Sequence, residues 1–521
     1  MMEILNNNIP KKYKSFFEKE NFSEVKASDY ITEIQEIYLS DKRPWVIGFS
    51  GGKDSTAVLI LVYVSLLGLP SEKRHKPVFV VASDTLVETP VVVDHINNAL
   101  DAVQEGALRD NLPITTHKVI PETNETFWVN LLGKGYPAPT RQFRWCTERL
   151  KIDPVSDFIK QQVAEYDEVI VVLGSRSQES QSRAQVIARH KISGTRLARH
   201  TSLSNAFIYT PIDTWSVDDV WKIIRDLDEY DAPWGASNYG LWLLYLGSSQ
   251  GECPMVIDES TPSCGNSRFG CWTCTVVTKD RAMESLIESG DDWMEPLLKF
   301  RNMLANTGIV ENKNTFRNYK RRIGKVSYKW ATKGQDISEE RGHIPGPYWL
   351  KYRKEWLKEL LEIEKDLNSK GHKIELITKP ELHAIRKEWL TDPNEPDWED
   401  SLPTIYRSVY NTDLNWVYDD NVNFDKHDAE ILKELGSQYG VDAEMIMKLI
   451  EVENSMSGLS QRRGIFAKLE SILKQDWGSY EQIIQKHSKH QSKRDFDIHA
   501  EQIKKLDEAV SQLDKLDREY H

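Results

Sequence analysis

Short apolar runs alternate with segments of helical periodicity over roughly the first half of the chain. The runs cover residues 46–49 (VIGF), 78–83 (VFVVAS) and 169–175 (VIVVLGS), and helices are expected from Ser55 and over about residues 90–103. Short runs rich in β-branched residues are typical of parallel strands that are buried on both faces. The pattern therefore predicts an α/β fold, with a doubly wound, mostly parallel sheet.

Changes in this pattern of apolar and polar residues suggest four regions. Residues 1–40 are expected to form an N-terminal helical extension, and residues 41–232 the α/β domain. Residues 233–280 form a loop-rich insert that carries cysteines, and residues 281–521 return to helical spacing, with apolar stripes at 356–367 and 503–516. Such stripes usually face the core of their own domain, so we expect a mainly helical C-terminal region, although a partner interface would give the same pattern.

Composition excludes several classes of protein. With 40% hydrophobic and 28% charged residues, the chain is expected to be globular rather than disordered. Its formal net charge of −13 makes it a poor general binder of polyanions, so nucleic-acid contact would need a local basic patch. The N-terminus lacks the order of a signal peptide, and the most apolar stretch, 57–69, is too short to span a bilayer. We therefore expect a cytoplasmic protein that does not associate with membranes.

A glycine pair stands between the first apolar run and the helix that follows it. The full string is Ser50-Gly51-Gly52-Lys53-Asp54-Ser55-Thr56. The glycines let the backbone approach an anion, the helix start offers unpaired N–H groups, and Lys53 adds a positive charge. This string predicts a phosphate-binding loop. It differs from the Walker pattern because the lysine follows the glycine pair directly and precedes an aspartate.

Two further candidates stand at the ends of the other predicted strands. Asp84 follows the run at 78–83, and Gly174 lies near the end of the run at 169–175. Residues at the carboxyl ends of parallel strands line the ligand crevice of such sheets, which makes both candidates for contact with a nucleotide. Asp84 and Glu88 are equally suited to cap the following helix, and both interpretations stay open.

Basic residues nearby are candidates for binding phosphate or sulfate oxygens. Arg176 and Arg183 follow the strand that ends at Gly174, and their guanidinium groups would present two parallel donors to an oxyanion. Surface ion pairs are the simpler alternative for both arginines. Lys151 allows the same two interpretations.

Four of the five cysteines crowd into 22 residues, as a C-x10-C-x6-C-x2-C array of Cys253, Cys264, Cys271 and Cys274. A clustered, odd-numbered set in a long chain suits metal ligation or redox chemistry better than disulfides. Four thiolates satisfy zinc or an iron–sulfur cluster. We expect Cys264, Cys271 and Cys274 to be ligands, and local spacing makes Cys253 a candidate fourth.

The SGGKDS string resembles the loop of the PP-loop ATP pyrophosphatase superfamily, whose members cleave ATP between the α- and β-phosphates and adenylate an acceptor. The segments 84–90, 144–154, 174–183 and 209–221 resemble those of phosphoadenylyl-sulfate reductases. The resemblance implies ATP and Mg²⁺ as cofactors. It implies binding by Ser50, Gly51, Gly52, Lys53, Asp54, Ser55, Thr56, Asp84 and Gly174, and catalysis by Lys53, Asp54, Arg176 and Arg183, with Asp54 assisting the magnesium ion.

In similar reductases a four-iron cluster is held partly by a CxxC pair and partly by a tandem cysteine pair near an RxC…LK segment. Here Trp145 replaces the first cysteine of that pair and Cys146 remains. The resemblance thus implies a [4Fe-4S] cluster on Cys146, Cys264, Cys271 and Cys274, with Cys253 as the alternative fourth ligand. No cysteine follows Cys274, which disfavours plain sulfonucleotide reduction by a mobile C-terminal cysteine.

The strings RWCTERLK, GSRSQESQSRA and ECPMVIDESTPSCGNSRFGCWTC are similar to those of the DndC family of DNA phosphorothioation proteins, over about residues 40–280. That resemblance implies an ATP pyrophosphatase and sulfurtransferase that adenylates the DNA backbone before sulfur is incorporated. It implies a cysteine desulfurase as sulfur donor and DndD- and DndE-like partners. A sulfonucleotide reductase, a tRNA or small-molecule thiolating adenylase and a purely regulatory nucleotide-binding protein are the alternatives.

A basic segment offers a place for DNA. Residues 311–334 contain eight Lys or Arg residues against one Glu, interleaved with Phe316, Tyr319, Tyr328 and Trp330. Basic groups between aromatic side chains suit a nucleic-acid track with stacking platforms. The alternative is a solvated face above buried aromatic side chains.

Overall fold

The structure is a computed structural model that describes residues 9–179, 189–190, 192–247, 270–328, 343–392, 394–416, 426–456 and 464–487. The chain divides into two units. Unit 1 comprises Met1–Leu131, Ala138–Ile309 and Leu357–Ala384, and unit 2 comprises Leu132–Pro137, Val310–Trp356 and Ile385–His521. The chain therefore passes between the units several times, and unit 1 extends on both sides of residue 280.

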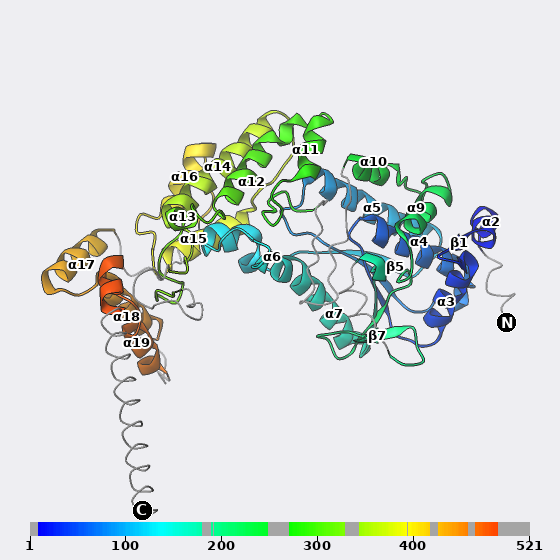
Figure 1. Cartoon of the computed structure of the whole chain (residues 1–521), viewed down its shortest axis with the longest axis horizontal. Helices are drawn as coiled ribbons and strands as arrows, with labels where there is room; N and C mark the ends of the chain where they lie inside the picture. The colour runs from blue at the N-terminus through cyan, green and yellow to red at the C-terminus, as the bar shows by residue number, and fades with distance from the viewer. Residues whose placement is uncertain are drawn as a thin grey trace, which may run out of the picture. The chain divides into compact units, whose positions relative to one another are not determined.

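Unit 1 contains a six-stranded sheet with the order β5-β4-β3-β6-β8-β7. Its two edge strands, β5 and β7, are labelled in Figure 1. The strands are β3 (Trp45–Gly48), β4 (Val78–Ser83), β5 (Ile114–Val119), β6 (Val169–Val172), β7 (Leu197–Arg199) and β8 (Ala206–Tyr209). β3 pairs in parallel with β4 and with β6, whereas β7 runs antiparallel to β8. The mostly parallel α/β fold expected from the sequence is confirmed.

Helices cover both faces of this sheet. Ile47 and Val80 belong to the cluster that also holds residues of α3 (Ala27–Leu39), α4 (Lys53–Gly68), α5 (Pro90–Arg109) and α9 (Val217–Asp226). Their neighbours in the strands, Val46 before Ile47 and Val81 after Val80, pack on the other face with Ile159 of α7 (Asp153–Tyr166). Successive strand residues point to opposite faces, so both must be apolar when both faces are covered. This explains the continuous apolar runs in the sequence.

The remaining elements of unit 1 surround this core. The N-terminal segment forms α2 (Lys11–Lys19) and a hairpin of β1 (Asn21–Phe22) and β2 (Val25–Lys26) ahead of α3. α6 (Trp145–Thr147) continues through a π-helical turn, Glu148–Ile152, into α7. α10 (Tyr239–Gly247), α11 (Arg281–Glu288) and α12 (Glu295–Asn306) follow. α10 lies in a stretch for which the sequence predicted only loops.

Unit 2 is helical in its described part. Its elements are α13 (Lys313–Phe316), α16 (Ser401–Tyr410), α17 (Lys426–Tyr439), α18 (Ala443–Ser455) and α19 (Ile465–Leu473). α14 (Leu350–Ser369) and α15 (Lys379–Leu390) each begin in one unit and end in the other. The predicted stripe at residues 356–367 lies in α14, and the stripe at 503–516 lies outside the described residues.

A short peptide, residues 132–137, is bound into unit 2 by its backbone. Four consecutive carbonyl groups each accept a hydrogen bond: Leu132 from Trp389 Nε1 (2.7 Å), Gly133 from Arg353 Nη1 (2.6 Å), Lys134 from Arg322 Nη1 (2.6 Å) and Gly135 from the Tyr348 amide (2.7 Å). Buried carbonyl groups need such donors. The peptide is therefore an integral part of unit 2.

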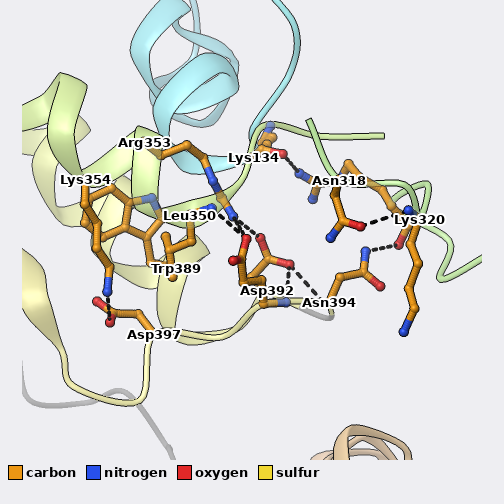
Figure 2. Close-up of polar contacts among 12 residues, drawn as sticks. Lys134, Asn318, Lys320, Leu350, Arg353, Lys354, Trp389, Asp392, Asn394 and Asp397 are labelled. Carbon is orange, nitrogen blue, oxygen red and sulfur yellow. Dashed lines mark hydrogen bonds and ion pairs between the residues drawn. The ribbon is translucent and has the colours of Figure 1, made fainter. Parts of the chain in front are cut away.

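Arg353 is the centre of a buried polar network in unit 2 (Figure 2). Its guanidinium group donates to Asp392 Oδ2 at 2.8 Å as well as to the Gly133 carbonyl, and Arg353 is fully buried. The other oxygen of Asp392 accepts from the amides of Asn394 and Glu395, while Glu395 accepts from the Leu350 amide. One arginine thus joins three separate segments of the chain.

Among the described residues, no helix combines the length and the apolar character that crossing a membrane requires.

Candidate functional site

The predicted phosphate loop lies between β3 and α4. Gly51 has a φ of +69°, and a Cβ atom added there would approach Ile96 Cγ1 to 2.8 Å, so only glycine fits. Ser55 holds the turn closed, because its hydroxyl accepts from the Ser50 amide at 3.2 Å and donates to the Gly52 carbonyl at 2.9 Å. α4 begins at Lys53, and its first amide groups therefore face the loop. This is the geometry that anion binding requires.

Two buried cations share one buried carboxylate beside the loop. Lys53 Nζ lies 2.8 Å from Asp54 Oδ2, and Arg176 Nε donates to Asp54 Oδ1 at 2.6 Å. The exposed fractions of these side chains are 5%, 1% and 3% for Lys53, Asp54 and Arg176. The triad carries a net charge of +1, which favours an incoming anion. Asp54 was expected to assist a magnesium ion, but here both its oxygens serve the two cations.

Gly174 brings the end of β6 against the start of α4. A Cβ atom at residue 174 would lie 2.8 Å from the carbonyl carbon and oxygen of Asp54. The absence of a side chain thus lets Arg176, two residues later, reach the Asp54 carboxylate. Arg176 lies beside the loop through its contact with Asp54, while its role in binding phosphate stays a prediction, and Arg183 lies outside the described residues.

His95 of α5 supports the loop from a third side. Its Nε2 lies 3.2 Å from the Gly51 carbonyl, and because a carbonyl only accepts, Nε2 carries the proton. Burial lowers the pKa of His95 below its ordinary value, which favours the neutral ring. No motif identified His95, because a histidine within an amphipathic helix carries no sequence signal of its own.

Asp84 stabilises the turn after β4. Its Oδ1 accepts from the Leu86 amide at 2.9 Å, and its Oδ2 lies 3.3 Å from Lys118 Nζ. Leu86 has a φ of +63°, a conformation that such a turn supports. α5 starts four residues beyond Leu86, after Thr89, so Asp84 caps the turn rather than the helix.

Glu88 connects the strand end to the cysteine-bearing segment. The Trp272 amide donates to the Val87 carbonyl and the Thr89 amide to the Gly270 carbonyl, both at 3.0 Å, and Glu88 pairs with Cys271 as an antiparallel bridge. The sequence offered helix capping as an alternative for Glu88. The structure gives it a different role, since its carboxylate binds the cysteine loop.

The Cys271 thiol contacts two polar side chains of the segment that follows β4. Its Sγ lies 3.6 Å from Glu88 Oε1 and 3.4 Å from the Thr85 hydroxyl, and Lys151 Nζ lies 3.1 Å from the same Glu88 oxygen. Burial, and then the Glu88 charge, raise the pKa of the Cys271 thiol well above its ordinary range. Metal binding at Cys271 would therefore have to displace a proton. Lys151 lies beside this thiol.

The CxxC loop is held rigidly on its other side. Arg301 is fully buried and donates to the carbonyl groups of Cys274 (2.8 Å), Thr278 (3.1 Å) and Val277. Trp272 packs its ring against Trp128 and Phe300. Two thiols on a fixed CxxC loop fit the ligand types that zinc and iron–sulfur clusters require, so the described residues offer half of such a site.

The rest of the predicted ligand set is not assembled here. Cys253 and Cys264 lie outside the described residues. Cys146, Cys271 and Cys274 form no disulfide with one another, and in the part of the chain that the structure describes no three His, Cys, Asp or Glu side chains converge as a metal site. The choice between Cys146 and Cys253 as fourth ligand stays a prediction.

The described part of the basic segment, residues 311–328, uses its arginines within unit 2. Arg317 donates to the carbonyl groups of Gly346 and Pro345, both at 2.6 Å, and Arg321 donates to Pro345 at 3.2 Å. Burial lowers the pKa of Arg317 to about 10. Lys320 is only 6% exposed and lies 3.7 Å from Glu444.

The aromatic side chains of this segment also have partners within unit 2. Phe316 packs against Tyr352, Tyr319 against Trp349, and Tyr328 against His487. Trp330 lies outside the described residues. The three rings are partly exposed, so they differ from the buried aromatic side chains of the alternative interpretation, and contact of this segment with DNA stays a prediction.

The chain resembles known proteins over part of its length. Residues 44–277 match the phosphoadenosine phosphosulfate reductase domain family. Two uncharacterized proteins of Methanocaldococcus jannaschii are 30% and 25% identical over 199 and 255 residues, which are 38% and 48% of this chain. The chain spans about a third of the first relative and about half of the second, at 35% and 47% of their lengths.

Solved structures show weaker likeness. A phosphoadenylyl-sulfate reductase from Candida auris has a TM-score of 0.27 and 16% identity, over 42% of this chain and 86% of that one. The U34-tRNA thiolase NcsA from Methanococcus maripaludis, with its [4Fe-4S] cluster, has a TM-score of 0.23 and 12% identity, over 41% and 69%. These scores are too low to support a conclusion about activity. The residues that match the family, 44–277, include all six strands of the sheet.

Proposed function

We propose that this chain is the ATP-dependent component of a DNA sulfur modification system. A non-bridging oxygen of a DNA phosphate attacks the α-phosphorus of ATP, the bond to the β-phosphate oxygen breaks, and pyrophosphate leaves. Sulfur at the oxidation level of sulfide then attacks the DNA phosphorus and displaces AMP. A cysteine desulfurase provides this sulfur as a persulfide, which a thiol reduces.

One observation carries the proposal: the phosphate loop and the cysteine loop occupy the same edge of the sheet. The phosphate loop follows β3, and Glu88, which binds Cys271, follows β4. These two strands are parallel neighbours, so their carboxyl ends lie side by side. An enzyme that joins nucleotide activation to sulfur chemistry needs both groups on one edge.

Residues in and beside the loop would stabilise the negative charge of the reacting phosphates in different ways. Lys53 and Arg176 would stabilise the negative charge that develops on the transferring phosphates, together with amide groups of the glycine pair. Asp54 holds the two cations at a fixed separation before ATP arrives. Mg²⁺ would neutralise charge on the transferring phosphates, and Asp84, whose carboxylate also contacts the Leu86 amide and Lys118, is the predicted carboxylate outside the triad that would hold it.

The cysteine loop would hold half of a [4Fe-4S] cluster, with Cys271 and Cys274 as ligands and Cys264 with Cys146, or Cys253, completing the set. When bound, such a cluster would supply sulfur ligation and electron transfer. Arg301 would fix the Cys274 side of the loop, and Glu88 and Thr85 the Cys271 side. DndD- and DndE-like proteins would help to bring DNA to the site, because the chain carries a net charge of −13.

Anaerobically purified protein and α-labelled ATP test the proposal. We expect AMP and pyrophosphate as products, formed faster with DNA and the partner proteins, and iron bound to the protein. Lys53→Ala should lower the rate at least about 100-fold, whereas Lys73→Ala, at an exposed position, should leave it unchanged. ADP as the product, or an unaltered rate in Lys53→Ala, would contradict the assignment.

The family match favours one further candidate, the reduction of a sulfonucleotide. That reaction predicts sulfite from phosphoadenylyl sulfate with thioredoxin as the electron donor, and it requires no pyrophosphate release. Measuring sulfite and pyrophosphate on the same preparation separates the two reactions.

A further inference from the structure

Tyr245 of α10 reaches into the phosphate loop. Its hydroxyl oxygen lies 3.3 Å from the Lys53 amide nitrogen, and a Cβ atom added at Gly52 would be 3.2 Å from the same oxygen. The Lys53 ammonium group lies 5.4 Å from the centre of the Tyr245 ring. This ring and that of Trp221 of α9 form a T-shaped pair with a centroid distance of 5.1 Å. Three independent contacts thus fix the tyrosine over the loop.

This position is one that a phosphate oxygen would take. Lys53 is the first residue of α4, so its amide has no acceptor within the helix, and Tyr245 provides one. The Lys53 ammonium group is bound in the same way by Asp54 at 2.8 Å. Both donors of the residue that should bind phosphate are therefore engaged by acceptors of the protein itself.

We propose that Tyr245 is a plug for the nucleotide site: its hydroxyl occupies the loop without nucleotide and withdraws when the phosphates of ATP enter. The inference rests on the proposed function in one respect, that the loop binds a nucleotide. It adds a residue outside the family motifs and assigns α10 a role in controlling access.

The relative strengths of the two contacts favour this exchange. A neutral phenol oxygen at 3.3 Å is at the long end of hydrogen-bond distances, whereas a phosphate oxyanion forms shorter and stronger bonds with the same donors. The plug therefore yields to ATP but competes with it. Removing the Tyr245 hydroxyl should therefore tighten nucleotide binding. The factor should match the equilibrium constant of the hydrogen bond that the Lys53 amide loses.

Equilibrium binding to the full chain tests the plug. The probes are α,β-methylene-ATP with Mg²⁺ and, separately, inorganic pyrophosphate. Tyr245→Phe keeps the ring over Lys53 and removes only the hydroxyl, so it should bind both probes about 2- to 10-fold more tightly than the wild type. The matched control is Tyr239→Phe on the same helix, where the side chain is half exposed and packs against Tyr230, and its affinity should not change.

Weaker binding by Tyr245→Phe would overturn the plug, because it would make the hydroxyl a ligand of the phosphate. Unchanged binding would overturn it as well. Both results leave the proposed function standing, since the loop still binds nucleotide. Absence of binding in the wild type and in Tyr245→Phe would contradict the nucleotide site and the plug together.

Hydrogen exchange gives a second measurement that does not depend on affinity. If Tyr245 withdraws, the amides of residues 239–247 should exchange faster when α,β-methylene-ATP is bound, while those at the start of α4 become protected. Protection of residues 239–247 by the nucleotide would show that α10 closes on the ligand, which would contradict the plug.

Discussion

Arg176 donates its Nε–H to Asp54 Oδ1 at 2.6 Å, with both side chains almost completely buried. The contact joins the residue after β6 to the first turn of α4, which are 122 positions apart in the sequence. Since Lys53 binds the other oxygen of the same carboxylate, one aspartate sets the positions of both cations near the loop.

Asp54→Asn should therefore be costly. It leaves two buried cations with a neutral partner, and we expect a loss of about 3–5 kcal/mol in the free energy of unfolding, together with loss of pyrophosphate release. Chemical denaturation measures the first effect. Asp226→Asn, which disrupts a partly exposed pair with Arg225, is the control and should cost no more than about 0.5 kcal/mol. Equal effects of the two substitutions would refute the role of the triad.

His95 predicts a dependence of stability on pH. Burial lowers its pKa in the folded protein below the ordinary value of 6.5, so the unfolded chain binds more protons between those two values. Stability should fall as the pH drops below about 6.5, because the ring then takes up a proton in the unfolded chain but not yet in the folded protein. His95→Gln keeps a donor for the Gly51 carbonyl and cannot be protonated.

We expect His95→Gln to lose less stability than the wild type between pH 7 and pH 5, measured by denaturant titration at each pH. His75→Gln is the control, because His75 is exposed and its Nδ1 lies 3.0 Å from a backbone carbonyl, that of Lys73. If stability changes with pH by the same slope in His95→Gln and in His75→Gln, protonation of His95 does not cause the loss of stability.

Arg353 is expected to be essential for the folding of unit 2. Arg353→Lys keeps the charge but cannot bind the Gly133 carbonyl and Asp392 at once, so it should cost about 3–5 kcal/mol in the free energy of unfolding. Lys358→Ala on the exposed face of the same helix should change stability by less than about 0.5 kcal/mol. A small loss in Arg353→Lys would mean that the peptide at 132–137 does not depend on this arginine.

Lys448 should respond to pH in the opposite range. Burial lowers its pKa from 10.5 to about 8, although its ammonium group binds Gln475 at 2.8 Å and lies 4.7 Å from the centre of the Trp477 ring. Between pH 8 and 10.5 the unfolded chain binds more protons at this group, so its cost to stability is present below pH 8 and disappears as the pH rises.

Lys448→Met should therefore stabilise the protein at pH 7 by about 1–2 kcal/mol. This gain is smaller than the cost of burying the Lys448 charge, because the substitution also removes the hydrogen bond to Gln475. The advantage should vanish by about pH 10. Thermal unfolding at both pH values checks this. A variant that is less stable at pH 7 would show that the hydrogen bond outweighs the burial of the charge.

The sequence predicted the centre of the sheet well and its edges poorly. β4 coincides with the predicted run at 78–83, because a strand that is buried on both faces must be apolar throughout. β5, with the sequence ITTHKV, was missed because it is an edge strand, and edge strands carry polar side chains. α4 begins at Lys53, two residues before the predicted start, since the loop itself provides the first helical turn.

The site was predictable only where residues near in sequence make it. The phosphate loop could be identified from one string, and Arg176 from its place after a strand. Tyr245 could not, because α10 is a short apolar helix in a stretch rich in glycine, serine and cysteine. Lys151 contacts Glu88 beside Cys271, which depends on how two strand ends and a loop meet in space, and no spacing in the sequence encodes that.

The bound peptide at 132–137 changes how this protein can be dissected. Its carbonyl groups rely on Arg322, Tyr348, Arg353 and Trp389, which lie about 190 to 260 positions further along the chain. A protein shortened after residue 309 would lack all four donors, and α14 and α15 as well. Loss of ATP chemistry in such a truncation would therefore report misfolding. Point substitutions in the intact chain are the way to ask what the C-terminal half contributes.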